Sequence, residues 1–357
     1  MKAEKHFPPD YKTARANFIA AAEARDLGTT ARLNPNAKTR DGKNLFLDTT
    51  IIGKRDAKKT LLMISATHGV EGYFGSGVQT GMLREGIEAP KGAKIVMLHA
   101  LNPYGFAWDR RVNEDNADIN RNFVDHKKPP ANKDYAKMAE AISPRDLNKM
   151  TWKAANAVLR AYSDKHGAFA LQEAITKGQY KYPDGIYYGG SKESWSAAML
   201  RDVCREELRD TKKLIVIDFH TGLGPFGYGE MISEDMPGSA AYKRAKRMWG
   251  DRVCSAEAGE SVSAPLNGTV DKAVAKFLPD TQLTFAALEA GTIPSREVFN
   301  ALRKDNFLHR FAGGKHKDAE AIRRECRDAF YCDTPEWKRK VWKTSKEVVK
   351  AALEALS

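Results

Sequence analysis

The sequence predicts an α/β fold in which helices cover both faces of a mixed, mostly parallel central sheet. Four continuous apolar runs of strand length support this prediction, at residues 60–66, 94–100, 213–219 and 281–288. Continuous apolar runs are typical of parallel strands that are buried on both faces. Stretches with helical spacing separate the runs, and strands that alternate with helices favour parallel pairing.

The remaining elements of the amino-terminal part follow from local signals. A helix is expected to begin after Asp10, because apolar residues at helical spacing follow it and Gly28 supplies a stop signal. Residues 44–52 predict a strand that ends at Gly53. A second helix is expected at residues 74–84, between the first two apolar runs.

Two mostly helical regions are expected outside the sheet. The first is an insertion at about residues 127–178, and the second is a carboxyl-terminal tail at about residues 294–357. The last helix of the tail is expected to begin after the N-cap residue Thr334. We predict a single domain, residues 1–357, with its core at about residues 44–292. Two domains are the alternative.

The composition is that of a globular protein, with 42% apolar and 29% charged residues among 357. No apolar run approaches the roughly 20 residues of a membrane-spanning helix. The first ten residues lack the basic head and apolar stretch of a secretory signal. The four cysteines form no C-x-x-C pair, which is typical of reduced thiols. We therefore expect a cytoplasmic protein with no membrane partner.

The chain is basic, with a formal net charge of +12. Its basic residues are spread along the sequence, and the densest stretch, residues 338–350, alternates with apolar residues as on the outer face of an amphipathic helix. Since the sequence also lacks a recognisable nucleic-acid-binding motif, we expect no nucleic-acid partner. The positive charge is compatible with an anionic substrate.

Candidate metal ligands follow the expected strands. His68 and Glu71 form an H-x-x-E pair directly after the first apolar run, His220 ends the third run and Glu289 ends the fourth. Eight histidines and 46 carboxylates in 357 residues give, by chance, about one histidine with an Asp or Glu three residues later, so position is more informative than spacing. Loops at the carboxyl ends of parallel strands are where open α/β sheets bind ligands.

Two histidines and a carboxylate are a zinc ligand set that leaves a position open for water. Zinc lowers the pKa of this water toward neutrality, and a nearby carboxylate can then accept the proton. The alternative is that His68 and His220 are structural residues whose rings hydrogen-bond to the backbone. Their shared position at strand ends, with Glu289 at another strand end, favours the zinc site.

Five elements occur in an order that resembles the zinc carboxypeptidase superfamily of metallohydrolases. They are an H-x-x-E pair, an Asn-Pro loop, an arginine-containing loop that ends in Asp-x-Asn-Arg-Asn-aromatic, a strand-end histidine and a strand-end glutamate. In this chain they are His68 with Glu71, residues 102–106, residues 118–123, His220 and Glu289. The segments THGVEG, NEDNADINRNF and YPDGIYYGG are most similar to a bacterial branch related to aspartoacylase and succinylglutamate desuccinylase.

The resemblance implies the zinc carboxypeptidase fold and a role for each matching residue. One zinc ion per chain would be held by His68, Glu71 and His220. Glu289 would act as general base for the attacking water and later pass the proton to the leaving nitrogen. Asp118 would orient His68 through its other ring nitrogen.

The resemblance also implies residues that contact the substrate. Arg110 or Arg111 would stabilise the oxyanion, and Arg111 is the favoured of the two. Asn120 and Arg121 would bind a substrate carboxylate, with Arg121 as a bidentate partner. Judged without the resemblance, an interior ion pair for Arg121 and a turn for Asn120 are the favoured interpretations.

The sequence departs from the family pattern in three places. Tyr104 stands where the carboxypeptidases have Asp in their Asn-Pro-Asp-Gly-Phe segment, and Glu289 lacks the preceding Phe. The mobile tyrosine that covers the substrate in the carboxypeptidases has no clear counterpart. Tyr188 and Tyr228 are candidates because they lie in glycine-containing loops, although packing is the favoured role for each.

The leading hypothesis is a zinc-dependent hydrolase that cleaves an amide bond next to a free carboxylate. Its substrate would be a peptide carboxyl terminus or an N-acyl amino acid, and these residues do not separate the two. The alternative is a catalytically inactive member of the family that acts as a ligand-binding protein.

Overall fold

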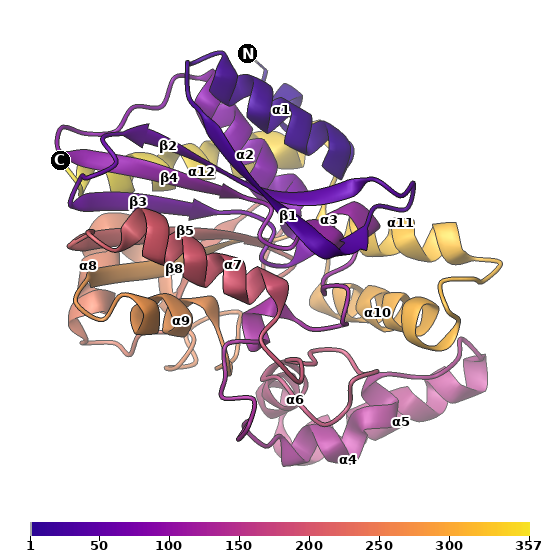
Figure 1. Cartoon of the computed structure of the whole chain (residues 1–357). Helices are drawn as coiled ribbons and strands as arrows, with labels where there is room; N and C mark the ends of the chain where they lie inside the picture. Colours follow the sequence, from indigo (N-terminus) through magenta and orange to yellow (C-terminus); the bar gives the residue numbers. More distant parts are fainter. Residues whose placement is uncertain (1) are drawn as a thin grey trace.

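The structure is a computed structural model, and it describes residues 2–357. An eight-stranded sheet has the strand order β1-β2-β4-β3-β5-β8-β6-β7 (Figure 1). The strands are β1 (Thr29–Lys38), β2 (Asn44–Gly53), β3 (Lys59–Ile64), β4 (Ala93–His99), β5 (Lys213–Thr221), β6 (Gly229–Ser233), β7 (Val253–Ser255) and β8 (Gln282–Ala290). Pairs β3–β4, β3–β5, β5–β8 and β6–β7 are parallel, and the other three are antiparallel. The prediction of a mixed, mostly parallel sheet is confirmed.

The four apolar runs of the sequence form the central strands β3, β4, β5 and β8. Alternate residues of these strands enter two separate cores: Leu61 and Met63 of β3 point to one face, while Leu62 and Ile64 point to the other. Both faces are covered, so neither set of side chains meets solvent. This double burial is why the strands are continuously apolar rather than alternating.

Helices cover each face of the sheet, as expected. One face packs against α1 (Tyr11–Glu23), α2 (Gly72–Arg84), α8 (Ala240–Trp249) and α12 (Pro335–Glu354). The other packs against α7 (Trp195–Val203) and α9 (Val270–Phe277). The expected caps are present, since Asp10 accepts a hydrogen bond from the Thr13 amide at 2.7 Å and Thr334 accepts one from the Trp337 amide.

A third core lies at one end of the sheet, where the helical insertion meets the tail (Figure 1). The insertion contains α4 (Lys133–Ile142), α5 (Lys149–His166) and α6 (Ala168–Thr176), and the tail contributes α10 (Ser295–Asn306) and α11 (Ala319–Phe330). Val70, from the H-x-x-E segment, is buried in this same core. The helices expected at 127–178 and after 294 are therefore confirmed, and they border the candidate site.

Three strands of the sheet were not expected from the sequence. β1 carries Pro35 and pairs only with β2, as proline tolerates an edge position in a sheet. β6 and β7 are short and lie at the opposite edge. The prediction of free thiols is confirmed for all four cysteines. Among residues 2–357, no helix is both long and apolar enough to cross a lipid bilayer. The single-domain organisation stays a prediction.

Candidate metal centre

The parallel central strands bring the predicted site residues to one end of the sheet. His220 in β5 lies directly opposite Glu289 in β8 in the strand register. β3 ends at Ile64, and Ala66 then adopts φ +58°, a left-handed conformation that L-residues rarely take. This turn redirects the chain, so that His68 follows β3 at the same end of the sheet.

Two loops are held together beside His68. The amide of Gly69 donates to the carbonyl of Arg111 at 3.1 Å, and the amide of Val70 donates to the carbonyl of Arg110 at 2.8 Å. A side chain at Gly69 has no room, because its Cβ would lie 2.1 Å from the carbonyl carbon of Gly105, in α3 (Pro103–Trp108). This close approach fixes the arginine loop against the H-x-x-E segment.

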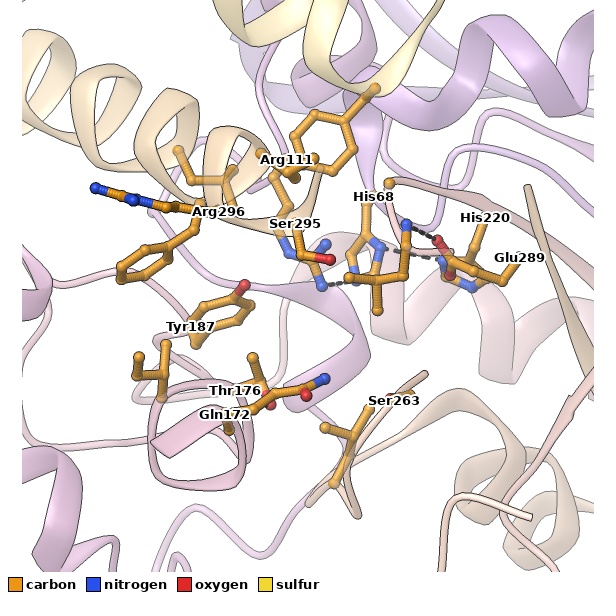
Figure 2. A pocket seen from close by; sticks show the side chains of 18 of the residues that line it. His68, Arg111, Gln172, Thr176, Tyr187, His220, Ser263, Glu289, Ser295 and Arg296 are labelled. Atoms are coloured by element: carbon orange, nitrogen blue, oxygen red, sulfur yellow. Dashed lines mark hydrogen bonds between the residues drawn. The ribbon is translucent and has the colours of Figure 1, made fainter. Parts of the chain in front are cut away.

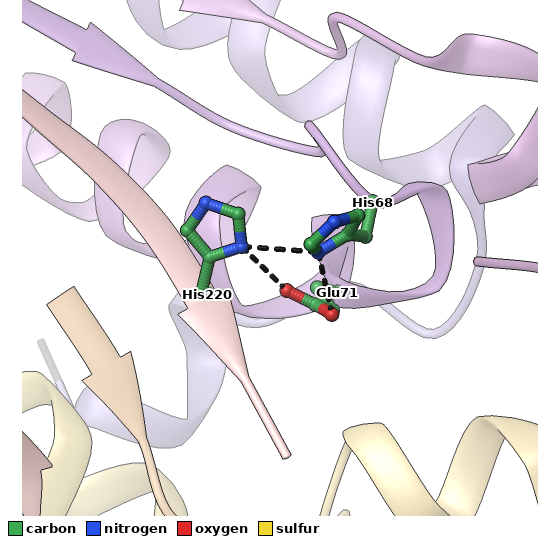
Figure 3. A group of neighbouring side chains, drawn as sticks. All are labelled: His68, Glu71 and His220. Atoms are coloured by element: carbon green, nitrogen blue, oxygen red, sulfur yellow. Dashed lines mark hydrogen bonds and ion pairs between the residues drawn. The ribbon is translucent and has the colours of Figure 1, made fainter. Parts of the chain in front are cut away.

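His68, Glu71 and His220 converge on one point (Figure 3). The two Nδ1 atoms are 3.1 Å apart, and the Glu71 carboxylate reaches His68 Nδ1 at 2.9 Å and His220 Nδ1 at 3.0 Å. One ligand atom from each residue lies within 4.8 Å of the others, and all three residues are buried. Imidazole nitrogens and a carboxylate oxygen in this arrangement are donors that suit Zn²⁺.

Each histidine is backed by a buried carboxylate on its far side. His68 Nε2 lies 3.2 Å from Asp118 Oδ1, and His220 Nε2 lies 2.9 Å from Asp218 Oδ2. At His220, a carboxylate that accepts the Nε2 proton leaves the Nδ1 lone pair free to bind a metal. At His68, the Arg111 guanidinium also approaches Nε2, at 2.7 Å. Sequence reasoning found Asp118 but missed Asp218, although a position two residues before His220 on a strand points to the same face.

The charges around the cluster favour a bound cation. Burial alone would raise the pKa of both Glu71 and Asp118. His68 and His220 instead lower the pKa of Glu71, and Arg111, followed by His68, lowers that of Asp118. Burial opposes protonation of His220, yet Asp218 and Glu71 raise its pKa well above the usual range. The ionised carboxylates thus favour a proton on His220, and a divalent cation would displace that proton.

Glu289 faces the same cavity beside the cluster (Figure 2). Its Oε1 accepts a hydrogen bond from the Leu223 amide at 2.9 Å. Burial and the negative charge of Glu71 raise the pKa of Glu289 to about 8. A carboxylate with a raised pKa is a stronger base than an exposed one, which suits a group that must accept and return a proton.

The structure separates the two candidate arginines. Arg111 lines the cavity, and its guanidinium binds Asp118 at 2.9 Å and Glu71 at 3.2 Å. Arg110 turns away and binds Asp305 at 3.0 Å and Asn116 at 3.1 Å. Arg111 is therefore the one of the pair that lies at the cluster.

Asn120 and Arg121 both line the cavity, but their side chains have different hydrogen-bond partners. Asn120 accepts a hydrogen bond from the Val270 amide at 2.9 Å. Arg121 is 2% exposed and donates to the carbonyls of Thr176 and Asn120, each at 2.8 Å. Within residues 2–357 no carboxylate lies at ion-pair distance from Arg121, and burial lowers its pKa. Because arginine still keeps its charge in proteins, an anionic ligand would neutralise it.

The tyrosine at the site is Tyr187, which sequence reasoning missed by one position. Its ring lies 5.2 Å from the Arg111 guanidinium carbon and 5.7 Å from that of Arg121 (Figure 2). Tyr187 has φ +55°, which turns its neighbour Tyr188 away. Tyr188 is buried and its carbonyl accepts from the Asp118 amide, whereas Tyr228 is 44% exposed. No local sequence signal distinguishes Tyr187 from Tyr188 in the segment GIYYGG.

The cavity beside the cluster has a volume of about 570 Å³, within the range of small-molecule sites. His68, His220, Glu289 and Arg111 line it (Figure 2), and so does Arg121. The helical insertion and α10 supply an apolar wall that consists of Leu159, Leu171, Ile175, Val298, Phe299 and Leu302. The insertion therefore shapes the space that a ligand would occupy.

Comparison with solved structures finds several metallohydrolases of similar architecture at low sequence identity. Carboxypeptidase A from Helicoverpa armigera is 12% identical, with a TM-score of 0.49 over 97% of this chain and 74% of that chain. A metallo-carboxypeptidase from Burkholderia cenocepacia is 11% identical, with a TM-score of 0.47 over 99% and 71%. An aspartoacylase family protein from Mesorhizobium loti is 13% identical, with a TM-score of 0.40 over 80% and 67%.

A search of the curated proteins finds no match to this sequence. One family model matches residues 7–344, which is nearly the whole chain and includes every candidate site residue. That family is described as "Protein of unknown function (DUF2817)". The chain belongs to the DUF2817 family.

Proposed function

We propose that this protein is a zinc-dependent hydrolase that cleaves an amide bond next to a free carboxylate. One observation carries the proposal: a buried His-Glu-His cluster shares a cavity with the carboxylate of Glu289 and with the guanidinium of Arg121, which forms no ion pair among residues 2–357. The cluster supplies metal ligands, Glu289 supplies a base and Arg121 supplies a binding group for an anion.

The residues present fit a zinc ion. His68 and His220 would bind it through Nδ1, with Glu71 as the third ligand, because Asp118 and Asp218 occupy the Nε2 side of the rings. When bound, zinc supplies a Lewis acid that polarises a carbonyl and lowers the pKa of water.

Glu289 would move the proton during hydrolysis. It takes a proton from the attacking water as the water oxygen forms a bond to the amide carbon. The carbon–nitrogen bond then breaks, and Glu289 returns the proton to the leaving nitrogen. The products are a carboxylic acid and an amine, and Glu289 ends the cycle as it began.

Two arginines would position the substrate and stabilise charge. Arg121 is held rigidly by two backbone carbonyls, so its remaining donors can bind a substrate carboxylate. Arg111 lies between the metal cluster and Tyr187, where it would stabilise the negative charge that develops on the carbonyl oxygen.

A peptide with a free carboxyl terminus and an N-acyl amino acid both satisfy these requirements. Each places a carboxylate one carbon from the scissile nitrogen, so each matches a site with Arg121 near the cluster. The apolar wall formed by the insertion and α10 would hold the acyl or peptide portion.

The test is hydrolysis of a panel of N-acyl amino acids and short peptides by zinc-loaded protein. Wild type is expected to turn over, and Glu289→Gln is expected to lose about 10²- to 10⁴-fold in kcat while it keeps zinc. Glu230→Gln is the matched control, because Glu230 is the strand partner of Glu289 but binds Ser261 and the Val262 amide instead. Full activity in Glu289→Gln would refute the assigned base, and binding without turnover by wild type would identify a ligand-binding protein.

A further inference from the structure

Arg110 is the buried neighbour of Arg111, and the proposed hydrolytic steps do not use it. Its side chain extends toward α10, where Nε forms an ion pair with Asp305 Oδ2 at 3.0 Å. Arg110 and Asp305 are each 3% exposed. Desolvation of two buried charges offsets much of their attraction, so stability alone does not explain an ion pair at this place.

The backbone that carries Arg111 to the metal cluster lies in neither a helix nor a strand. Asp109 and Asn116, on either side of it, have φ of +56° and +61°, left-handed conformations that are uncommon outside glycine. Such conformations persist only where the surrounding contacts hold them, and they cluster at functional sites. The direction of the Arg111 side chain therefore depends on the contacts that anchor this loop, and the ion pair between Arg110 and Asp305 is one of them.

The Arg110 guanidinium also reaches the segment that carries Tyr187. It donates to Asn116 Oδ1 at 3.1 Å, and Asn116 Nδ2 donates in turn to the carbonyls of Pro183 and Gly185, at 3.0 and 3.3 Å. Tyr187 itself has φ +55°, which is rare for a bulky residue, so its position also depends on contacts from outside its segment. One amide side chain thus links Arg110 to the Tyr187 segment.

A second set of contacts joins α10 directly to the same segment. Asn306, the residue after Asp305, donates through Nδ2 to the Asp184 carbonyl at 2.9 Å, and Arg310 Nε binds the Asp184 carboxylate at 2.9 Å. Behind the main cavity, Arg111 and Tyr187 line a small space together with Arg110, Asn116, Asp305 and Asn306. Because Arg111 and Tyr187 also line the main cavity, this network packs behind the two side chains.

We propose that Asp305 is a positioning residue, which acts through Arg110 to hold Arg111, with Tyr187 packed against it, beside the metal cluster. This inference rests on the proposed function, in which Arg111 stabilises the negative charge on the carbonyl oxygen. A displacement of about 1 Å at such a group can cost about 100-fold in rate, so the ion pair affects the reaction although it touches no substrate. Since α10 also supplies part of the apolar wall, the same ion pair fixes that wall relative to Arg111.

The kinetic test is a double-mutant cycle that combines Asp305→Asn with Arg111→Gln, assayed with zinc bound. Asp305→Asn alone is expected to lower kcat by about 10- to 100-fold. In the Arg111→Gln background the same substitution is expected to change kcat by at most about threefold, because the group that it positions is already absent. A loss of kcat in the Arg111→Gln background as large as in wild type would show a general structural effect and overturn the inference.

Two further variants complete the kinetic test. Asp48→Asn is the matched control, because it removes a comparably buried carboxylate from an ion pair with Arg15 outside the cavity lining, and it is expected to keep the wild-type kcat. Arg110→Lys covers the case in which Asp305→Asn does not fold. Lysine keeps the positive charge but lacks the planar fork that binds Asp305 and Asn116 together. Arg110→Lys is therefore expected to lose kcat in wild type and to lose no more in the Arg111→Gln background.

Nuclear magnetic resonance of protein with ¹⁵N-labelled arginine separates this inference from the proposed function. Arg111 Nε donates to Asp118 at 2.9 Å, so its proton is expected to exchange slowly and to give a signal that Arg111→Gln removes. Asp305→Asn is expected to shift or broaden this signal in zinc-loaded protein, whereas Asp48→Asn leaves it unchanged. A shifted signal would support the inference even if no amide is hydrolysed. An unchanged signal would refute the inference, and with hydrolysis intact the hydrolase proposal would stand.

Discussion

Replacement of Asp218 by asparagine isolates the effect of one buried charge on metal affinity. Asp218 lies 2.9 Å from His220 Nε2, and its two oxygens accept from the Thr67 hydroxyl at 2.8 and 2.9 Å. Asparagine has the same shape and can keep the hydrogen bond to His220, but it removes the charge that makes Nδ1 a stronger donor. Changes of this kind cost about 10- to 100-fold in metal affinity, or about 1.4–2.8 kcal/mol.

Zinc dissociation constants can be measured by competition with a chromophoric chelator. The matched control is Asp48→Asn, because Asp48 is equally buried but forms its ion pair with Arg15 in another part of the protein. The control is expected to bind zinc like wild type, whereas Asp218→Asn is expected to bind it at least tenfold more weakly. An Asp218→Asn affinity within twofold of wild type would refute the role that we assign to this carboxylate.

Three further outcomes follow from the contacts of single residues. Gly69→Ala is expected to lower the free energy of unfolding by about 1–3 kcal/mol in urea titrations, because the added Cβ would lie 2.1 Å from Gly105. Arg111→Gln is expected to lower kcat by about 10²- to 10³-fold in steady-state assays with zinc still bound, as for loss of an oxyanion donor. Burial lowers the pKa of His99 to about 3, whereas its pKa in the unfolded chain is about 6.5. Between these two pH values the unfolded chain binds a proton that the folded chain does not, so acid favours unfolding. Stability should then fall by about 2 kcal/mol between pH 7 and 5, and His99→Gln should remove that loss.

The first and the third of these outcomes have control variants. Gly28→Ala should be nearly neutral, because no atom lies within 4 Å of the added Cβ. His166 is exposed, so His166→Gln should leave the pH dependence of stability unchanged. The role assigned to a residue would be refuted if its variant behaved like wild type. The quantities to compare are the stability of Gly69→Ala, the kcat of Arg111→Gln and the pH dependence of the stability of His99→Gln.

The central strands could be predicted because both of their faces are buried. That burial requires apolar residues at every position, as in Leu61–Ile64, and such runs are visible without any partner. β1 could not be predicted, because it is an edge strand, mostly exposed and interrupted by Pro35. β7 has only three residues, too few for a periodic pattern.

Some residues of the candidate site could likewise be predicted from the sequence, and others could not. His68, His220 and Glu289 follow strand ends, and parallel strands bring their carboxyl ends together, so sequence position was enough to associate them. Tyr187 has no such signal, because it differs from Tyr188 only through a left-handed backbone conformation. Its place beside Arg111 and Arg121 depends on contacts between segments far apart in the sequence.

The central claim is that His68, Glu71 and His220 bind the metal on which hydrolysis depends. Its most direct test is the zinc content of purified, untagged protein by inductively coupled plasma mass spectrometry, with wild type beside His68→Ala. His126→Ala is the control, a histidine outside the cavity lining. We expect about one zinc per chain in wild type and in the control, and none in His68→Ala. Wild-type protein that contains no zinc, even after incubation with it, would contradict the claim.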